Sequence, residues 1–122
     1  MKPIIYSILF YMIISLLLSG CTKHPHCSDT DAWPTGMAYT HLKNSHIIEP
    51  ENLDWERTIT TRIASQKLGK DLYIQVHMIK FFTKDGESFT TIAVNEASNI
   101  ECSMSNIDLY IISKILGSYS NK

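Results

Sequence analysis

The chain has 122 residues, of which 11 are basic and 12 acidic, so its formal net charge at pH 7 is −1. This length suits one domain with a modest hydrophobic core. The balanced charge provides no basic surface for a phosphate backbone, which argues against nucleic-acid binding.

The N-terminal stretch is apolar and ends in small residues. After Lys2, the fifteen residues from Ile4 to Leu18 carry no charge. A membrane-spanning helix needs about 20 apolar residues, so this run is short for a span and suits the hydrophobic region of a signal peptide. Ser19 and Gly20 follow, and small residues are what signal processing requires before the cut.

The residues Leu18-Ser19-Gly20-Cys21 resemble the lipobox of bacterial lipoproteins. The resemblance implies that residues 1–20 are removed as a signal peptide and that Cys21 becomes the acylated first residue of the mature protein. Membrane lipid is then the first partner, because buried acyl chains hold a protein firmly to a bilayer. An uncleaved single-span anchor with an incidental cysteine is the alternative interpretation.

Thr22, directly after the modified cysteine, resembles the outer-membrane default of lipoprotein sorting. We therefore expect an outer-membrane anchor that faces the periplasm, with the inner membrane as the alternative.

Two further cysteines, Cys27 and Cys102, remain if Cys21 is acylated. The periplasm is oxidising, so this even pair predicts a disulfide. Such a bridge would close a long loop and add about 4 kcal/mol of stability in the chain-entropy model. Two free buried thiols are the alternative. Residues 21–27 are otherwise polar and are expected to be the lipidated cysteine and a short tether.

The predicted domain, residues 28–117, begins with a helix. N-cap candidates occupy residues 28–31, and Pro34 is tolerated only near a helix start, so the helix should run from about Pro34 to Lys43. Asn44 and Ser45 should end it. Residues spaced by three and four form its apolar face: Trp33, Met37, Ala38, His41 and Leu42.

Strand patterns follow the helix. Apolar and polar residues alternate over 57–65, from Leu72 onward and over 88–95. Turn signals separate these runs at residues 68–70 and, more strongly, at Lys84-Asp85-Gly86. Residues 110–112 favour a final strand, although residues 113–116 would also suit a helix. The last residues, 118–122, are expected to be a flexible tail.

The predicted fold is therefore α+β: a cleaved signal peptide, then one helix packed on an antiparallel sheet of about four strands. Met37, Ala38 and Leu42 would cover one sheet face. Because antiparallel sheets often leave one face solvated, we expect the other face, with Tyr73, His77 and Phe81, to be partly open.

The open face and a long polar loop are the candidate binding surface. The loop at residues 95–105 carries two carboxylates, and long ordered loops often present function on a rigid scaffold. A simple connection secured by the disulfide is the alternative. The candidate surface residues are Tyr73, His77, Phe81, Glu96, Glu101 and Ser103.

Catalytic and metal motifs give little support for an enzyme. Ser103, His77 and Glu96 could form a hydrolase triad on paper, but no nucleophile-elbow motif accompanies them. The run His-Pro-His-Cys at residues 24–27 offers metal ligands, although a closed site needs another ligand and a solvated tether explains it as well. The sequence has no glycine-rich phosphate loop, CxxC or HExxH motif. We predict no catalytic residues, metal or cofactor.

These observations favour a membrane-anchored periplasmic protein-binding module. Small lipoproteins of this size and location include inhibitors of cell-wall hydrolases and immunity proteins against periplasmic toxins, although fold-level analogy does not fix function. An envelope-assembly or structural accessory protein is the alternative, and a small hydrolase is the minor one.

Overall fold

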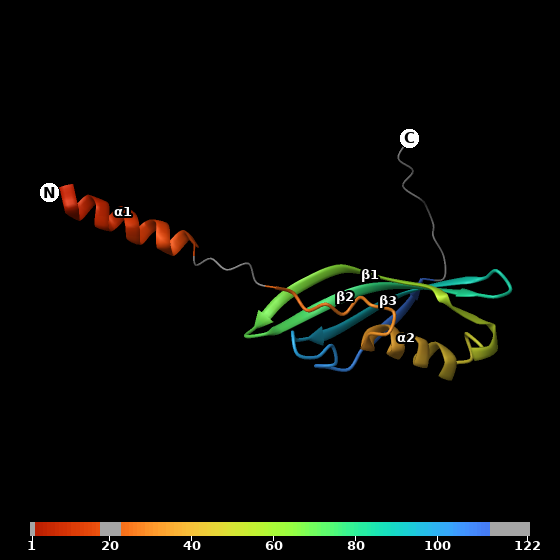
Figure 1. The fold of residues 1–122 in the computed structure, drawn as a ribbon. Coiled ribbons are helices and arrows are strands. Elements are labelled where there is room, and N and C mark those ends of the chain that lie inside the picture. Colours follow the sequence, from red (N-terminus) through yellow and green to blue (C-terminus); the bar gives the residue numbers. More distant parts are fainter. Residues whose placement is uncertain (1, 18–22, 113–122) are drawn as a thin grey trace.

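The computed structural model describes residues 2–17 and 23–112 (Figure 1). The predicted lipobox, residues 18–21, lies outside the described residues. Within the described ranges, no helix is both long enough and apolar enough to cross a membrane. The elements in chain order are α1 (Lys2–Leu17), α2 (Trp33–Asn44), the short 3-10 helix η1 (Pro50–Asn52), β1 (Leu53–Gly69), β2 (Leu72–Thr83), β3 (Ser88–Ala97) and β4 (Asp108–Ile112).

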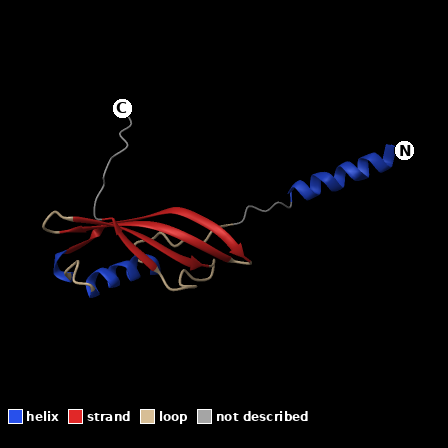
Figure 2. Cartoon of the chain, turned by 180° about the vertical axis from the view of Figure 1, so that it is seen from behind, coloured by secondary structure: helices blue, strands red, loops and turns tan. Residues whose placement is uncertain are grey.

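The four strands form one antiparallel meander. Their order is β1-β2-β3-β4, and each strand pairs with its neighbour in the chain. Figures 1 and 2 show α2 lying against one face of this sheet. We call this side the covered face and the opposite side the open face. The predicted α+β architecture, with one helix on a four-stranded antiparallel sheet, is confirmed.

Helix α2 extends one residue beyond each predicted end. Pro34 lies in its first turn, where a missing N–H costs no helical hydrogen bond. The N-cap is Ala32, which has no side chain to cap the helix, so the polar residues at 28–31 do not serve as its N-cap. Ser45 ends the helix, with its N–H bonded to the His41 carbonyl at 3.0 Å.

The two hairpin turns lie at opposite ends of the strands. Gly86 has a φ of 95° in the predicted turn between β2 and β3, a conformation that glycine adopts without strain. The turn between β1 and β2 falls at Lys70 and Asp71 because β1 continues to Gly69, so it lies slightly later than predicted. Asp71 adopts a φ of 47°, which aspartate tolerates better than most residues.

A hydrophobic core fills the space between α2 and the covered face. Ala38 and Leu42 of α2 are buried, and small alanines on β3 allow the helix to approach the sheet. Tyr39 and three later residues pack around this core while remaining partly exposed. The buried cluster consists of Ala38, Leu42, Ile48, Leu53, Ile79, Phe81 and Ala93.

The structure corrects the predicted orientation of the sheet. Tyr73, His77 and Phe81, expected on the open face, are only 3%, 0% and 0% exposed and lie on the covered face. Alternation decides this, since these residues share a face with Ile79 and with Ala93 of the neighbouring strand. The more regular apolar series on β2 therefore points away from α2.

The structure also corrects the predicted tether. Pro25 and Cys27 are buried, so residues 23–27 are part of the fold. This segment crosses the covered face near β1 and β2 (Figure 1). The favoured strand at residues 110–112 is confirmed within β4, while residues 113–116 and the predicted tail at 118–122 lie outside the described residues.

Candidate functional site

The open face has a row of paired residues that crosses all four strands and is apolar on β2 and β3, with a threonine on β1 and a tyrosine on β4. Thr61 pairs with Met78, Met78 pairs with Ile92, and Ile92 pairs with Tyr110. Directly paired residues project from the same side of an antiparallel sheet, so these side chains are neighbours. Met78 is 38% exposed and Tyr110 is 59% exposed, which leaves the row accessible from solvent.

Parallel rows extend this apolar surface and give it a polar margin. Val76 pairs with Val94 on one side of the central row, and both are half-buried. Lys80 and Thr90 pair on the other side. Glu96 pairs with Ile74 near the start of β2, so this predicted surface residue lies at the margin of the open face. An apolar centre with a polar rim is the usual anatomy of a protein interface.

The covered face has a polar layer instead of a purely apolar one. Gln75 and Asn95 are cross-strand neighbours, and His77 follows on the same side of β2. All three residues are buried. Both ring nitrogens of His77 lack a hydrogen-bond partner among the described residues, as do the amide oxygens of Gln75 and Asn95. Unpaired buried polar groups reduce stability, so this layer is a weak point of the fold.

His77 is held in its neutral form. Burial and, to a smaller extent, the positive charge of Arg62 together lower its pKa from 6.5 to about 4. Arg62 is the cross-strand partner of His77 on β1. A desolvated imidazole next to a cation binds a proton poorly. His77 is therefore a buried core histidine at neutral pH.

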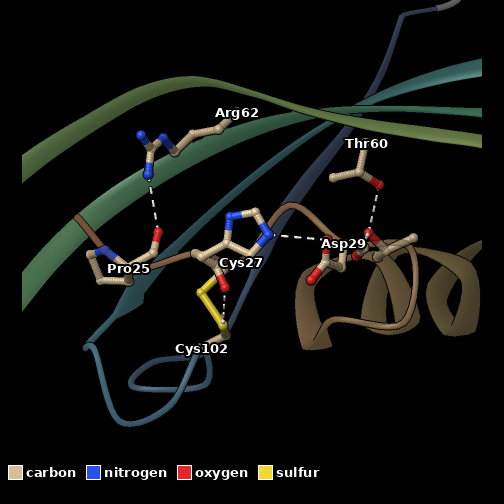
Figure 3. Close-up of polar contacts among 8 residues, drawn as sticks. Pro25, Cys27, Asp29, Thr60, Arg62 and Cys102 are labelled. Atoms are coloured by element: carbon tan, nitrogen blue, oxygen red, sulfur yellow. Dashed lines mark hydrogen bonds and ion pairs between the residues drawn. A yellow bond between two sulfur atoms is a disulfide. The ribbon is translucent and has the colours of Figure 1, made fainter. Parts of the chain in front are cut away.

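The N-terminal segment of residues 23–28, which we call the strap, is bonded to the sheet. Arg62 Nη1 donates to the Pro25 carbonyl at 3.0 Å, and Gln75 Nε2 donates to the same oxygen at 2.9 Å (Figure 3). His24 Nδ1 lies 2.7 Å from Ser65 Oγ. These contacts hold the strap across the second half of β1 and the start of β2.

A disulfide between Cys27 and Cys102 secures the other end of the strap (Figure 3). The two Cα atoms are 5.8 Å apart and the cysteines are separated by 75 positions in the chain. Cys27 is fully buried. The predicted bridge is confirmed, and it joins the strap to the loop that follows β3.

The loop between β3 and β4 is ordered by its own hydrogen bonds. Asn95 Nδ2 donates to the Cys102 carbonyl at 2.6 Å, and the Glu96 N–H donates to Ser105 Oγ at 2.8 Å. The Met104 N–H donates to the Glu96 carbonyl at 3.0 Å. These bonds hold the loop against β3, so its exposed residues have a defined position.

The six predicted surface residues do not form one site. Tyr73, His77 and Phe81 lie in the core, whereas Glu101 and Ser103 are exposed in the loop after β3. No hydrogen bond links Ser103 to His77 among the described residues, and buried His77 is closed to a substrate. His77 is therefore not placed to act as a general base for Ser103.

The histidines and cysteine of the strap have other partners. His26 Nε2 lies 3.0 Å from an Asp29 carboxylate oxygen, His24 contacts Ser65, and Cys27 is in the disulfide. Within residues 2–17 and 23–112, no group of three or more histidine, cysteine, aspartate or glutamate side chains is placed to hold a metal ion.

Neither the protein-family models, nor the curated proteins, nor the solved structures gave a match.

Met78 and Tyr110 were not among the predicted surface residues. The alternation on β2 and β3 was visible, but it marks two faces without saying which one a helix covers. Tyr110 offered a signal, because it interrupts an isoleucine-rich strand with an aromatic side chain that also carries a hydroxyl. Such amphipathic aromatics suit surfaces that bind other proteins.

Proposed function

We propose that this chain is a bacterial lipoprotein held to the outer membrane through acylated Cys21, and that its open face binds another protein on the periplasmic side. The lipobox residues support the anchor. The row from Thr61 through Met78 and Ile92 to Tyr110 carries the binding part of the proposal.

An accessible apolar surface of this kind is unusual for a protein that works alone. Soluble monomers rarely leave large contiguous apolar patches exposed, and such patches with polar borders mark interaction sites. Tyr110 supplies an aromatic side chain with a polar tip, while Met78 adapts its shape to a partner surface. An apolar partner surface with hydrogen-bonding groups at its edge would complement both.

Photocrosslinking in intact cells tests the binding proposal. The photoreactive amino acid benzoylphenylalanine replaces Met78 in the full chain, and a matched control variant carries it at Lys43, which is exposed on α2. We expect adducts with a protein from position 78 and none from position 43. Equal labelling from both positions, or no protein adduct at 78, would contradict the proposed binding face.

The identity of the crosslinked protein separates the partner classes. A cell-wall hydrolase or an imported toxin would identify the chain as an inhibitor or immunity protein. A resident assembly protein of the envelope would identify it as an accessory protein. Replacing Cys21 by serine tests the anchor separately, because it should abolish labelling with a fatty-acid probe and leave an unprocessed precursor.

A further inference from the structure

One end of the sheet carries exposed apolar side chains beside the start of the folded chain. Ile100 is 90% exposed, and Leu68 and Met104 are exposed as well. Leu68 is near the end of β1, and the other two lie in the loop after β3. We call these three residues the entry tip, because the strap begins next to them.

Hydrogen bonds fix the first residue of the strap at this tip. Asn99 Nδ2 donates to the Lys23 carbonyl at 2.9 Å and to an Asp71 carboxylate oxygen at 2.8 Å. The Asn99 N–H donates to the same Asp71 oxygen at 2.9 Å. Asn99, next to Ile100 in the chain, therefore joins Lys23 to Asp71 in the turn between β1 and β2.

Two residues of the entry tip share a hollow. Ile100 and Met104 line one shallow hollow together with Lys70. Lys23, Lys67 and Lys70 contribute positive charges near the tip, while Asp71 and Glu101 contribute negative ones. These charges nearly balance, so the tip combines exposed apolar side chains with little net charge.

The chain leading into the tip indicates what this surface meets. Cys21 precedes Lys23 by two positions, and two residues span at most about 7 Å even when fully extended. If Cys21 carries the acyl chains of the proposed anchor, Lys23 is held within about 7 Å of the acylated residue, and its bond to Asn99 brings the loop of the entry tip close to the membrane surface. Chain length therefore keeps the start of the folded domain close to the membrane.

We propose that the entry tip docks on the phospholipid bilayer, with Ile100, Leu68 and Met104 inserted among the headgroups. This inference rests on the proposed lipid anchor, which delivers the tip to the surface. Lysine stems lie along apolar surface while their ammonium groups reach phosphates, so Lys23 and Lys70 suit the rim of such a contact.

The test uses the full chain, purified from bacterial membranes and reconstituted into phosphatidylethanolamine–phosphatidylglycerol vesicles that contain a clickable phospholipid. Benzoylphenylalanine replaces Ile100 in one variant and Lys84 in the control. Lys84 is exposed in the turn at the opposite end of β2. We expect a lipid adduct from position 100 and none from position 84. A second pair of variants carries benzoylphenylalanine at position 104, with and without Ile100→Asp. The Ile100→Asp substitution should reduce the lipid adduct at position 104 several-fold.

A fatty-acid label on each sample separates failure of the docking from failure of the anchor. A labelled protein without a lipid adduct at position 100, or with equal adducts at 84, would overturn the docking and leave the anchor intact. An adduct at 100 without the fatty-acid label would support the docking and contradict the anchor. Absence of both signals would contradict both proposals. If position 100 instead crosslinks to a protein in cells, the entry tip binds that protein and the docking on the bilayer is contradicted.

Discussion

His77 combines burial with the ability to take up a proton, and this makes it the most pH-sensitive residue of the core. It lies on the covered face with no hydrogen-bond partner for either ring nitrogen among the described residues. Its cross-strand neighbour is the cation Arg62. A protonated imidazole here would be both desolvated and next to a positive charge, so protonation favours the unfolded chain.

The free energy of unfolding should therefore fall in mildly acidic solution. The folded-state pKa of His77 is about 4 and the unfolded value is 6.5, so the unfolded chain binds the proton more readily between these values. Stability is fully present above pH 6.5 and is lost as the pH falls toward 4, by about 3 kcal/mol if this group acts alone. Urea unfolding at pH 7.5 and 4.5 measures the difference.

A His77→Leu variant is the control for this effect. It removes the proton site and two unpaired polar atoms at similar volume, so it should flatten the pH dependence and raise stability at pH 7 by about 1 kcal/mol. The lowered pKa values of Asp71 and Asp85 matter only below their ordinary value of 3.8. A wild-type profile that is flat from pH 7.5 to 4.5 would exclude His77 as a buried neutral histidine.

At the scale of elements, the strap depends on the disulfide to stay on the sheet. The strap is short and polar, and its contacts to Arg62 and Gln75 all use the Pro25 carbonyl. The Cys27–Cys102 bond closes a loop over 75 positions. Replacing both cysteines by alanine should lower the free energy of unfolding by about 4 kcal/mol, because the unfolded chain regains the entropy of that loop.

Thermal unfolding with and without reductant checks this expectation. The wild type should lose stability on reduction, while the Cys27→Ala/Cys102→Ala variant should not change with reductant. If reduction leaves the wild type unaffected, the strap is held by its hydrogen bonds and buried Pro25 instead.

Local sequence signals predicted the elements well because each depends on nearby residues. Helix α2 and the turn at Gly86 follow from Pro34, apolar spacing and the glycine itself. The strands follow from alternation. Which face of the sheet α2 covers depends on tertiary contacts, and there the prediction was wrong. Ile79 and Phe81 lie on the same side of β2 as the polar residues Gln75 and His77, and both are fully buried. These two large residues indicate the core side of β2 better than the apolar series from Leu72 to Met78.

The strap was mistaken for a tether for a similar reason. Its residues are polar and make no apolar pattern, so their attachment depends on partners far along the chain, such as Gln75 and Cys102. Only the cysteine pairing was visible in the sequence, and it alone predicted that residue 27 is fixed. The prediction that Tyr73, His77 and Phe81 belong to a binding surface was wrong for the same reason, since the exposure of a strand residue depends on which layer covers it.

At the scale of the whole molecule, the two proposed surfaces are compatible. The entry tip lies where β1 ends and β2 begins, and the turn at Gly86 lies at the other end of the same strands. With the tip on a bilayer, the strands would lead away from the membrane and the open face would stand to the side. Met78 and Tyr110 would then remain accessible to a protein partner while the domain is anchored.

Substitutions of two aromatic residues should distinguish effects on folding from effects on binding. Phe81 is fully buried in the core, and its ring lies 6.5 Å from that of Trp55. Tyr110 is 59% exposed on the open face. Phe81→Ala should lower the free energy of unfolding by about 3–5 kcal/mol through loss of burial and the cavity left behind. Tyr110→Ala should change it by no more than about 0.5 kcal/mol, as expected for an exposed site.

Tyr110→Ala should nevertheless strongly reduce the protein adduct formed by benzoylphenylalanine at position 78, since aromatic anchors contribute much of the energy of an interface. Urea unfolding of both alanine variants and crosslinking at position 78 in the Tyr110→Ala background measure the two effects. A matched Lys43→Ala change on α2 should leave stability and adduct close to wild type. If Tyr110→Ala destabilises the fold as much as Phe81→Ala, or leaves the adduct unchanged, Tyr110 is a structural residue and the binding face lies elsewhere.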